Sequence, residues 1–215
     1  DPKVEKFAKG HRWVLNLDGI EAYTQKLVGD AFTVRSSMGA GKWARVPWIT
    51  ITEPSQTTQA GLFLQYLVRA DVSGFYLAMG QGTSKLRAAA GPSAQSTHMA
   101  HVGSYVRRRL MALLGQHCAH FDLHGKVELR APKGHGVPFE KAIIVSRFYA
   151  KGGVPPEAHL VAHLKMLVAA YAQILTEPAY DALQKGLASA TQLGTQQQAL
   201  AAALGLGGSA TAKKG

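Results

Sequence analysis

The spacing of apolar residues along the chain changes once, near residue 32. Over 19–32 apolar residues recur at helical spacing, which predicts a first helix that ends near Gly29. Four short runs rich in β-branched and aromatic residues follow, at 32–37, 44–51, 62–70 and 74–80. Because Gly, Pro, Ser and Asp separate these runs, the middle of the chain is predicted to be an antiparallel meander.

Helical spacing returns at two places in the second half. After a break at Gly91 and Pro92, a helix is expected over about 104–114, with three arginines on the side opposite its apolar residues. A last long helix is expected to begin at Pro155 and Pro156, where a missing N–H costs nothing. Its apolar stripe extends to Leu175 and is predicted to face the core.

Two further strands are predicted between these helices, at 121–129 and 141–149. They are expected to lie on either side of a loop rich in Gly, Pro and His at 131–138. The predicted fold class is therefore α+β, with a mixed, largely antiparallel sheet flanked by helices in a single domain over residues 1–184.

The last part of the chain differs in composition. Residues 185–215 are rich in Ala, Gly, Gln, Thr and Ser, and their charge comes almost only from lysines. Such a segment buries too little apolar surface to offset its ordering entropy, so we expect a flexible linker to an effector domain. A frayed helix through Leu200 to Leu204 is the alternative, because Ala, Leu and Gln favour helices.

The charge balance favours a polyanionic partner. The chain has 24 Lys and Arg against 13 Asp and Glu, a formal net charge of +11, which suits nucleic acid or an acidic membrane surface. No window approaches the roughly 18 to 20 uninterrupted apolar residues of a membrane span. Cys118 is the single cysteine, which excludes an internal disulfide and predicts a cytoplasmic protein.

No catalytic motif, cofactor site or metal site is predicted. The GAGK tetrapeptide lacks the spacing of a phosphate loop, and Trp43 rather than Ser or Thr follows Lys42. Several histidines lie three or four residues apart, among them His159 and His163, but no HExxH or CxxC motif accompanies them. No GxSxG sequence is present either, so we expect a binding domain whose nuclease or nucleotidase partner lies elsewhere.

Two blocks of sequence resemble a known family. The first has a Gly39-Ala40-Gly41 turn, Trp43, and then Val46-Pro47-Trp48; it continues with Gly61-Leu62-Phe63 and the FYLAMGQGTS segment at 75–84. The second begins at PFEK and ends with a helix closing at Tyr171. Over roughly 19–184 the chain resembles the N-terminal DNA-recognition domain of McrB-type proteins, the methylcytosine-specific subunits of McrBC restriction systems.

This resemblance implies that a methylated cytosine is flipped out of a duplex into a pocket. The matching positions are Trp48, Phe63, Leu67 and Phe139. Independently of the family, Phe63 and Leu67 lie four apart in one predicted strand, so their side chains leave the same face. Aromatic rings would replace the lost base stacking, and Leu67 would contact the methyl group. The alternative for each aromatic residue is a place in the ordinary core.

Basic residues beside the Gly-x-Gly turn and the GQGTS turn are expected to hold the phosphates. The predicted backbone or wedge residues are Arg35, Ala40, Lys42, Trp43, Arg45, Lys85 and Arg87. Ala40 stands where the family can have an aromatic that fills the gap left by the flipped base. Met38, Lys42 or Trp43 would therefore have to fill it.

The sequence therefore predicts the sensor of a modification-dependent restriction system. Its partners would be double-stranded DNA with a modified cytosine and an effector nuclease or motor, with no membrane involved. The alternatives are a general single-stranded DNA or RNA binding module, whose aromatics stack on unflipped bases, and a peptide-binding domain. Which cytosine modification is preferred stays open.

Overall fold

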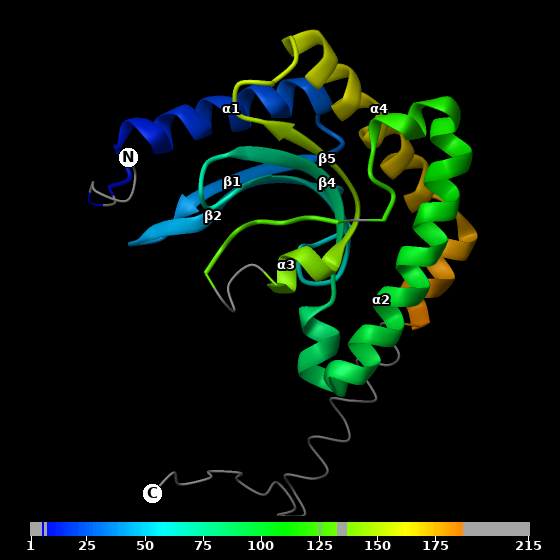
Figure 1. Cartoon of the computed structure of the whole chain (residues 1–215). Helices are drawn as coiled ribbons and strands as arrows, with labels where there is room; N and C mark the ends of the chain where they lie inside the picture. The colour runs from blue at the N-terminus through cyan, green and yellow to red at the C-terminus, as the bar shows by residue number, and fades with distance from the viewer. Residues whose placement is uncertain (1–5, 7, 125, 133–136, 187–215) are drawn as a thin grey trace, which may run out of the picture.

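A single antiparallel sheet organises the protein (Figure 1). The computed structural model describes residues 6, 8–124, 126–132 and 137–186 of the 215-residue chain. Its five strands lie side by side in chain order: β1 (Thr33–Gly39), β2 (Trp43–Thr52), β3 (Gly61–Val68), β4 (Gly74–Gly82) and β5 (Ile143–Ala150). The predicted α+β class and the four-strand meander are confirmed.

Strand pairing assigns the alternating side chains of the sheet to two faces. Trp48 pairs with Leu67 and Ile49 pairs with Tyr66 across β2 and β3. Ile49, with Leu64 of β3, therefore faces the main hydrophobic core, while Trp48 and Leu67 point to the opposite face. Both faces carry apolar side chains, so the sheet is covered on each side.

Three helices cover the main-core face: α1 (Arg12–Val28), α2 (Ser84–Leu114) and α4 (Glu157–Leu175). Figure 1 shows α1 and α4 outside the curve of the sheet, α2 at its side, and the short α3 (Val137–Ala142) inside the curve. Core residues contributed by the three helices include Leu17, Val106, Leu110, Leu164 and Leu167.

Two helices begin earlier than the sequence predicts. α1 starts at Arg12, not at residue 19, because His11 caps it by accepting a hydrogen bond from the Trp13 backbone N–H at 3.2 Å. α2 starts at Ser84 and not near residue 104. Gly91, with φ 83°, is the one non-helical residue inside it, and the chain resumes the helix directly at Pro92. The break is therefore a kink, since proline is compatible with the first turn of the resumed helix.

The strand predicted at 121–129 is wrong. After a 3₁₀ helix, η1 (Gly115–His120), the described residues of this stretch form one isolated bridge to the sheet, between Asp122 and Ser146, and no strand. The following residues instead cross the second face of the sheet, where Val127 and Leu129 are buried against a smaller apolar cluster. The alternating apolar residues belong to an extended segment that packs on the sheet without being one of its strands, because every second residue of an extended chain can be buried without hydrogen bonding to a neighbouring strand.

The last helix is confirmed, beginning after Pro156. Within the described residues, α4 is the one helix with the length and apolar composition of a membrane span, with a mean hydropathy of 1.3. Its buried residues pack into the main core, as those of a core helix do. The predicted linker falls almost wholly on 187–215, outside the described residues.

Two tyrosines fix the turn that precedes β3. The Tyr171 hydroxyl donates to the Leu62 carbonyl at 2.8 Å and accepts from the Glu53 N–H at 3.2 Å. The Tyr180 hydroxyl accepts from the Leu62 N–H at 3.2 Å. Burial is the main cause that raises the pKa of both phenols above the ordinary value, so both remain donors. They fix the backbone at Leu62, next to Phe63.

Candidate nucleic-acid interface

A cavity of about 390 Å³ opens on the second face of the sheet, within the size range of small-molecule sites. It is bounded by β2, β3, the end of β4, the start of α2 and the short α3. Its lining residues are Trp48, Thr50, Thr58, Phe63, Gln65, Gln81, Gly82, Thr83, Ser84, Gln95, Phe139 and Ala142.

Three aromatic residues predicted for the pocket meet in this cavity: Trp48, Phe63 and Phe139. Phe63 is 6% exposed, Trp48 is half-buried and Phe139 is 45% exposed. These exposures place Phe63 deepest and Phe139 at the rim. The cavity therefore presents aromatic surface from its depth to its rim.

Leu67, the fourth predicted pocket residue, lies behind the cavity and is not among its lining residues. It is fully buried and packs with Val46, Tyr76 and Leu129 in the smaller apolar cluster, on which Trp48 rests. The segment 126–131 covers this cluster from the second face. Leu67 thus supports the Trp48 ring from below.

Polar side chains line the rest of the cavity, and sequence reasoning missed them. Thr50 and Gln65 are buried and face each other across β2 and β3. From α2, the Gln95 amide donates to the Thr83 hydroxyl at 3.0 Å. One signal for Gln65 was available in the sequence, since it is the sole polar residue within the apolar run of β3. The cavity thus combines flat apolar surfaces with hydrogen-bonding groups.

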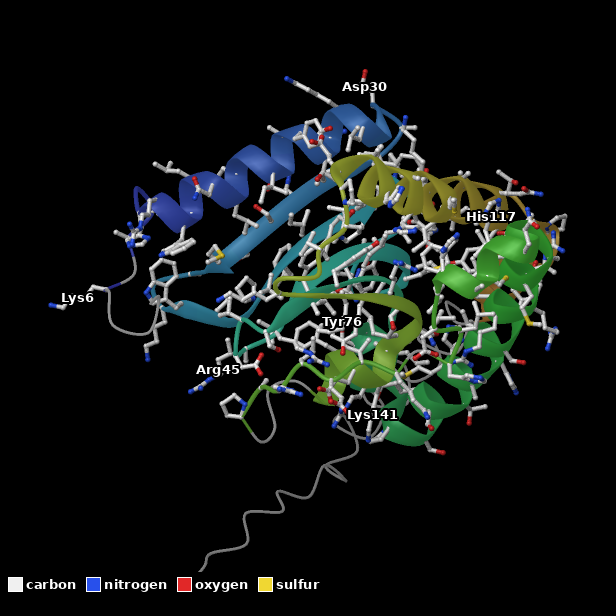
Figure 2. All side chains as sticks on the ribbon, turned by 45° about the horizontal axis from the view of Figure 1, so that its top comes forward. Lys6, Asp30, Arg45, Tyr76, His117 and Lys141 are labelled. Carbon is white, nitrogen blue, oxygen red and sulfur yellow. The ribbon has the colours of Figure 1, made fainter. Side chains whose placement is uncertain are left out.

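The predicted basic residues are exposed, and some lie beside the cavity. Lys85 and Arg87 follow Ser84, which lines the cavity, in the first turn of α2. Arg45 lies at the start of β2, and Lys141 belongs to α3 next to Ala142. Figure 2 shows Arg45 and Lys141 on the side of the molecule away from Asp30 and His117. Lys85, Arg87 and Lys141 therefore lie close in sequence to residues that line the cavity, and Arg45 lies three residues before Trp48.

The Gly-x-Gly turn is the tip of the β1–β2 hairpin. Gly39 has φ 124°, and a Cβ on it would meet the Lys42 carbonyl oxygen at 1.9 Å, so only glycine fits. Ala40 and Lys42 are exposed at the tip. Trp43 is half-buried and meets the His11 ring edge-on at 5.0 Å between centroids. Arg35 is exposed on the edge strand β1, away from the tip.

A second cavity, of about 340 Å³, lies between α1 and α4 on the main-core face. Its lining is almost wholly apolar, and Trp48 also borders it. Its polar groups are few: Tyr23 donates a short hydrogen bond to Glu157, and this bond raises the pKa of the Tyr23 hydroxyl. A nucleobase would lose its hydrogen bonds to water there without replacement, so the first cavity suits a base better.

The histidine-rich region near α4 is arranged for packing. His163 is buried, and its Nδ1 lies 3.1 Å from the Tyr149 hydroxyl. The pKa of His163 is lowered to about 4. Burial is the main cause, and the charges of Arg147 and of neighbouring histidines add to it. Among the described residues, no group of three or more His, Cys, Asp or Glu side chains is placed to hold a metal ion.

Comparison with known proteins agrees with the resemblance carried by the two sequence blocks. A family model described as "MrcB-like, N-terminal domain" matches residues 2–176. This range contains all five strands and every residue that lines the cavity. No curated protein matches the chain.

Proposed function

Because the chain belongs to the family of MrcB-like N-terminal domains, which supports a modified-DNA-binding role in restriction, we propose how the modified base is recognised. A modified cytosine rotates out of the duplex and enters the cavity lined by Trp48, Phe63 and Phe139. The observation that carries this proposal is the cavity itself. It joins aromatic surfaces to buried polar groups, and the exposed Lys85, Arg87 and Lys141 adjoin its lining residues in sequence.

The energetics of flipping are compatible with this cavity. Extruding a base costs a few kcal/mol of pairing and stacking, and each aromatic face returns about 1–3 kcal/mol per stacked base. Two of the three rings therefore suffice to offset the cost. Leu67 has no exposed surface, so its part in the proposal is to hold Trp48, and the methyl group is met by the rings themselves.

The duplex is held by the basic rim in this proposal. Lys85, Arg87 and Arg45 contact phosphates around the cavity, and Arg35 adds charge along β1. The hairpin tip enters the gap left by the base. Met38 packs against the main core and Trp43 lies against His11, which leaves the exposed Lys42 for that position.

In this proposal the domain recognises the modified DNA and a separate effector acts on it. Cleavage or nucleotide hydrolysis belongs to a separate domain or subunit, because no catalytic motif was found in the sequence. The segment 185–215 connects the two. This function places the protein in the cytoplasm, where it meets DNA.

The test uses duplexes that differ only at one cytosine, which is plain, 5-methylated or 5-hydroxymethylated, with 2-aminopurine as its neighbour. We expect at least one modified duplex to bind more tightly than the plain one and to raise 2-aminopurine fluorescence as the neighbour unstacks. Single-stranded competitor of the same sequence should compete poorly. Equal binding of all duplexes, or a preference for single strands whatever the modification, would refute the proposal.

A further inference from the structure

Gln65 has a buried side-chain amide with no protein partner, at the wall of the cavity. The residue is 2% exposed and lines the cavity from the middle of β3. Among the described residues its amide forms no hydrogen bond, and the amide atoms are not fully enclosed by protein, so the amide reaches the cavity. A polar side chain at so buried a position usually has a hydrogen-bond partner, and a ligand in the cavity would supply one.

The surroundings keep this amide open toward the cavity. A Cβ built on Gly80 of β4 would lie 2.9 Å from the Gln65 Nε2, so the amide packs over this glycine and a larger residue would displace it. On the other side, the Thr50 hydroxyl is directed to the Arg35 carbonyl at 3.4 Å. Neither neighbour satisfies the amide.

Phe63 sets the geometry of a base relative to this amide. Phe63 and Gln65 are two residues apart in β3, so both side chains leave the same face, roughly 7 Å apart along the strand. Phe63 pairs with Gly80, and the Gln65 amide packs over that glycine beside the Phe63 ring. A pyrimidine placed against Phe63 can therefore turn one edge toward Gln65.

We infer that Gln65 is the specificity-determining residue that hydrogen-bonds the Watson–Crick edge of the flipped cytosine, an inference that rests on the proposed function. Its Oε1 accepts from the exocyclic amine at C4, and its Nε2 donates to the ring nitrogen N3. An amide offers one acceptor and two donors, which matches the adjacent donor and acceptor on this edge. The aromatic rings recognise the flat base, and Gln65 recognises its amine.

The experiment is a double-mutant cycle between the protein and the base. Gln65→Leu is measured against wild type on duplexes carrying 5-methylcytosine or 5-methyl-2-pyrimidinone, the same ring without the amine. We expect Gln65→Leu to weaken binding of the 5-methylcytosine duplex about 10- to 100-fold, the range of a bidentate contact. Relative to 5-methylcytosine, the base without the amine should bind less well to wild type than to the variant, because only wild type loses a hydrogen bond to Gln65. Weaker pairing of the altered base acts equally on both proteins, so it cancels in the ratio.

Gln25→Leu is the matched control. The Gln25 amide donates to the carbonyls of Gly29 and Phe32 and accepts from the Val34 N–H, far from the cavity on α1. We expect this variant to lower Tm without changing discrimination. Gln65→Leu should keep Tm, because no hydrogen bond within the described residues is lost.

The outcomes separate this inference from the proposed function. If wild type binds neither the 5-methylcytosine nor the 5-hydroxymethylcytosine duplex more tightly than the plain one, the proposed function fails, and the inference with it. If wild type prefers a modified duplex but Gln65→Leu loses as much affinity for the base without the amine as for 5-methylcytosine, the two changes are additive and the inference alone is overturned. A fall in Tm with Gln65→Leu as large as that with Gln25→Leu would assign Gln65 a structural role and also overturn it.

Discussion

Trp48→Ala is the most direct perturbation of the proposed pocket. Trp48 lines the cavity, is half-buried and rests on the cluster that contains Leu67. Removing one stacking face should cost about 1–3 kcal/mol of base binding, or roughly 5- to 150-fold in affinity for a modified duplex. Affinity for the plain duplex comes from phosphate contacts and should change little.

The same truncation also removes packing, so its effect on folding must be measured separately. Trp→Ala in a full core costs about 3–5 kcal/mol, and roughly half of that, about 2 kcal/mol, is expected for a half-buried ring. This is within the usual 5–15 kcal/mol stability of a domain. The variant should therefore stay folded at 25 °C with a lower Tm.

The assay is fluorescence anisotropy with modified and plain duplexes, at a temperature well below the Tm of the variant. Trp13→Ala is the matched control, because Trp13 is 37% exposed on α1 and does not line the cavity. The ratio of the two affinities should approach one for Trp48→Ala and stay at the wild-type value for Trp13→Ala. A folded Trp48→Ala protein that keeps the wild-type ratio would remove Trp48 from the pocket.

Three further predictions concern charge, pH and the tyrosine clamp. Lys85→Ala combined with Arg87→Ala should lower the slope of log affinity against log salt by roughly 0.9 per lost phosphate contact, equally for modified and plain duplexes. Lys26→Ala, at the last turn of α1, is the control. An unchanged slope in the double variant would show that neither residue contacts a phosphate. The pKa of His163 is lowered to about 4 in the folded protein, so as pH drops the unfolded chain binds a proton before the folded protein does. Tm should therefore fall as pH drops from about 6.5 toward 4. If a His163→Gln variant shows the same fall in Tm, another group causes it. Tyr171→Phe should reduce the free energy of unfolding by about 1–2 kcal/mol in denaturant titrations, because its hydroxyl joins two backbone groups before β3, and a neutral result would mean that water replaces both bonds.

Local pattern was sufficient for most of the fold. The runs at 32–37, 44–51, 62–70 and 74–80 match β1 to β4, because strand spacing and turn residues are local signals. The pattern was misleading at 121–129, where Val127 and Leu129 alternate as a strand would. They are buried because they cover the second face of the sheet, which is a property of tertiary packing.

The candidate site was predicted in part. Trp48, Phe63 and Phe139 were selected through the family resemblance, and they line one cavity although Phe139 comes from α3, far along the chain. Gln65 was missed because a polar residue in an apolar strand has several explanations. Its unpaired state became visible only with its neighbours in place.

The sequence by itself determined the strand periodicity, the glycines required at the hairpin tip and the excess of positive charge, since each depends on neighbouring residues or on simple sums. The tertiary structure decided which face of β3 is covered by helices and which holds the cavity, and it placed Leu67 in the core and Gln65 at the cavity wall. Alternation assigns side chains to two faces without saying what covers either one. That depends on how distant segments pack, and a local pattern does not contain this information.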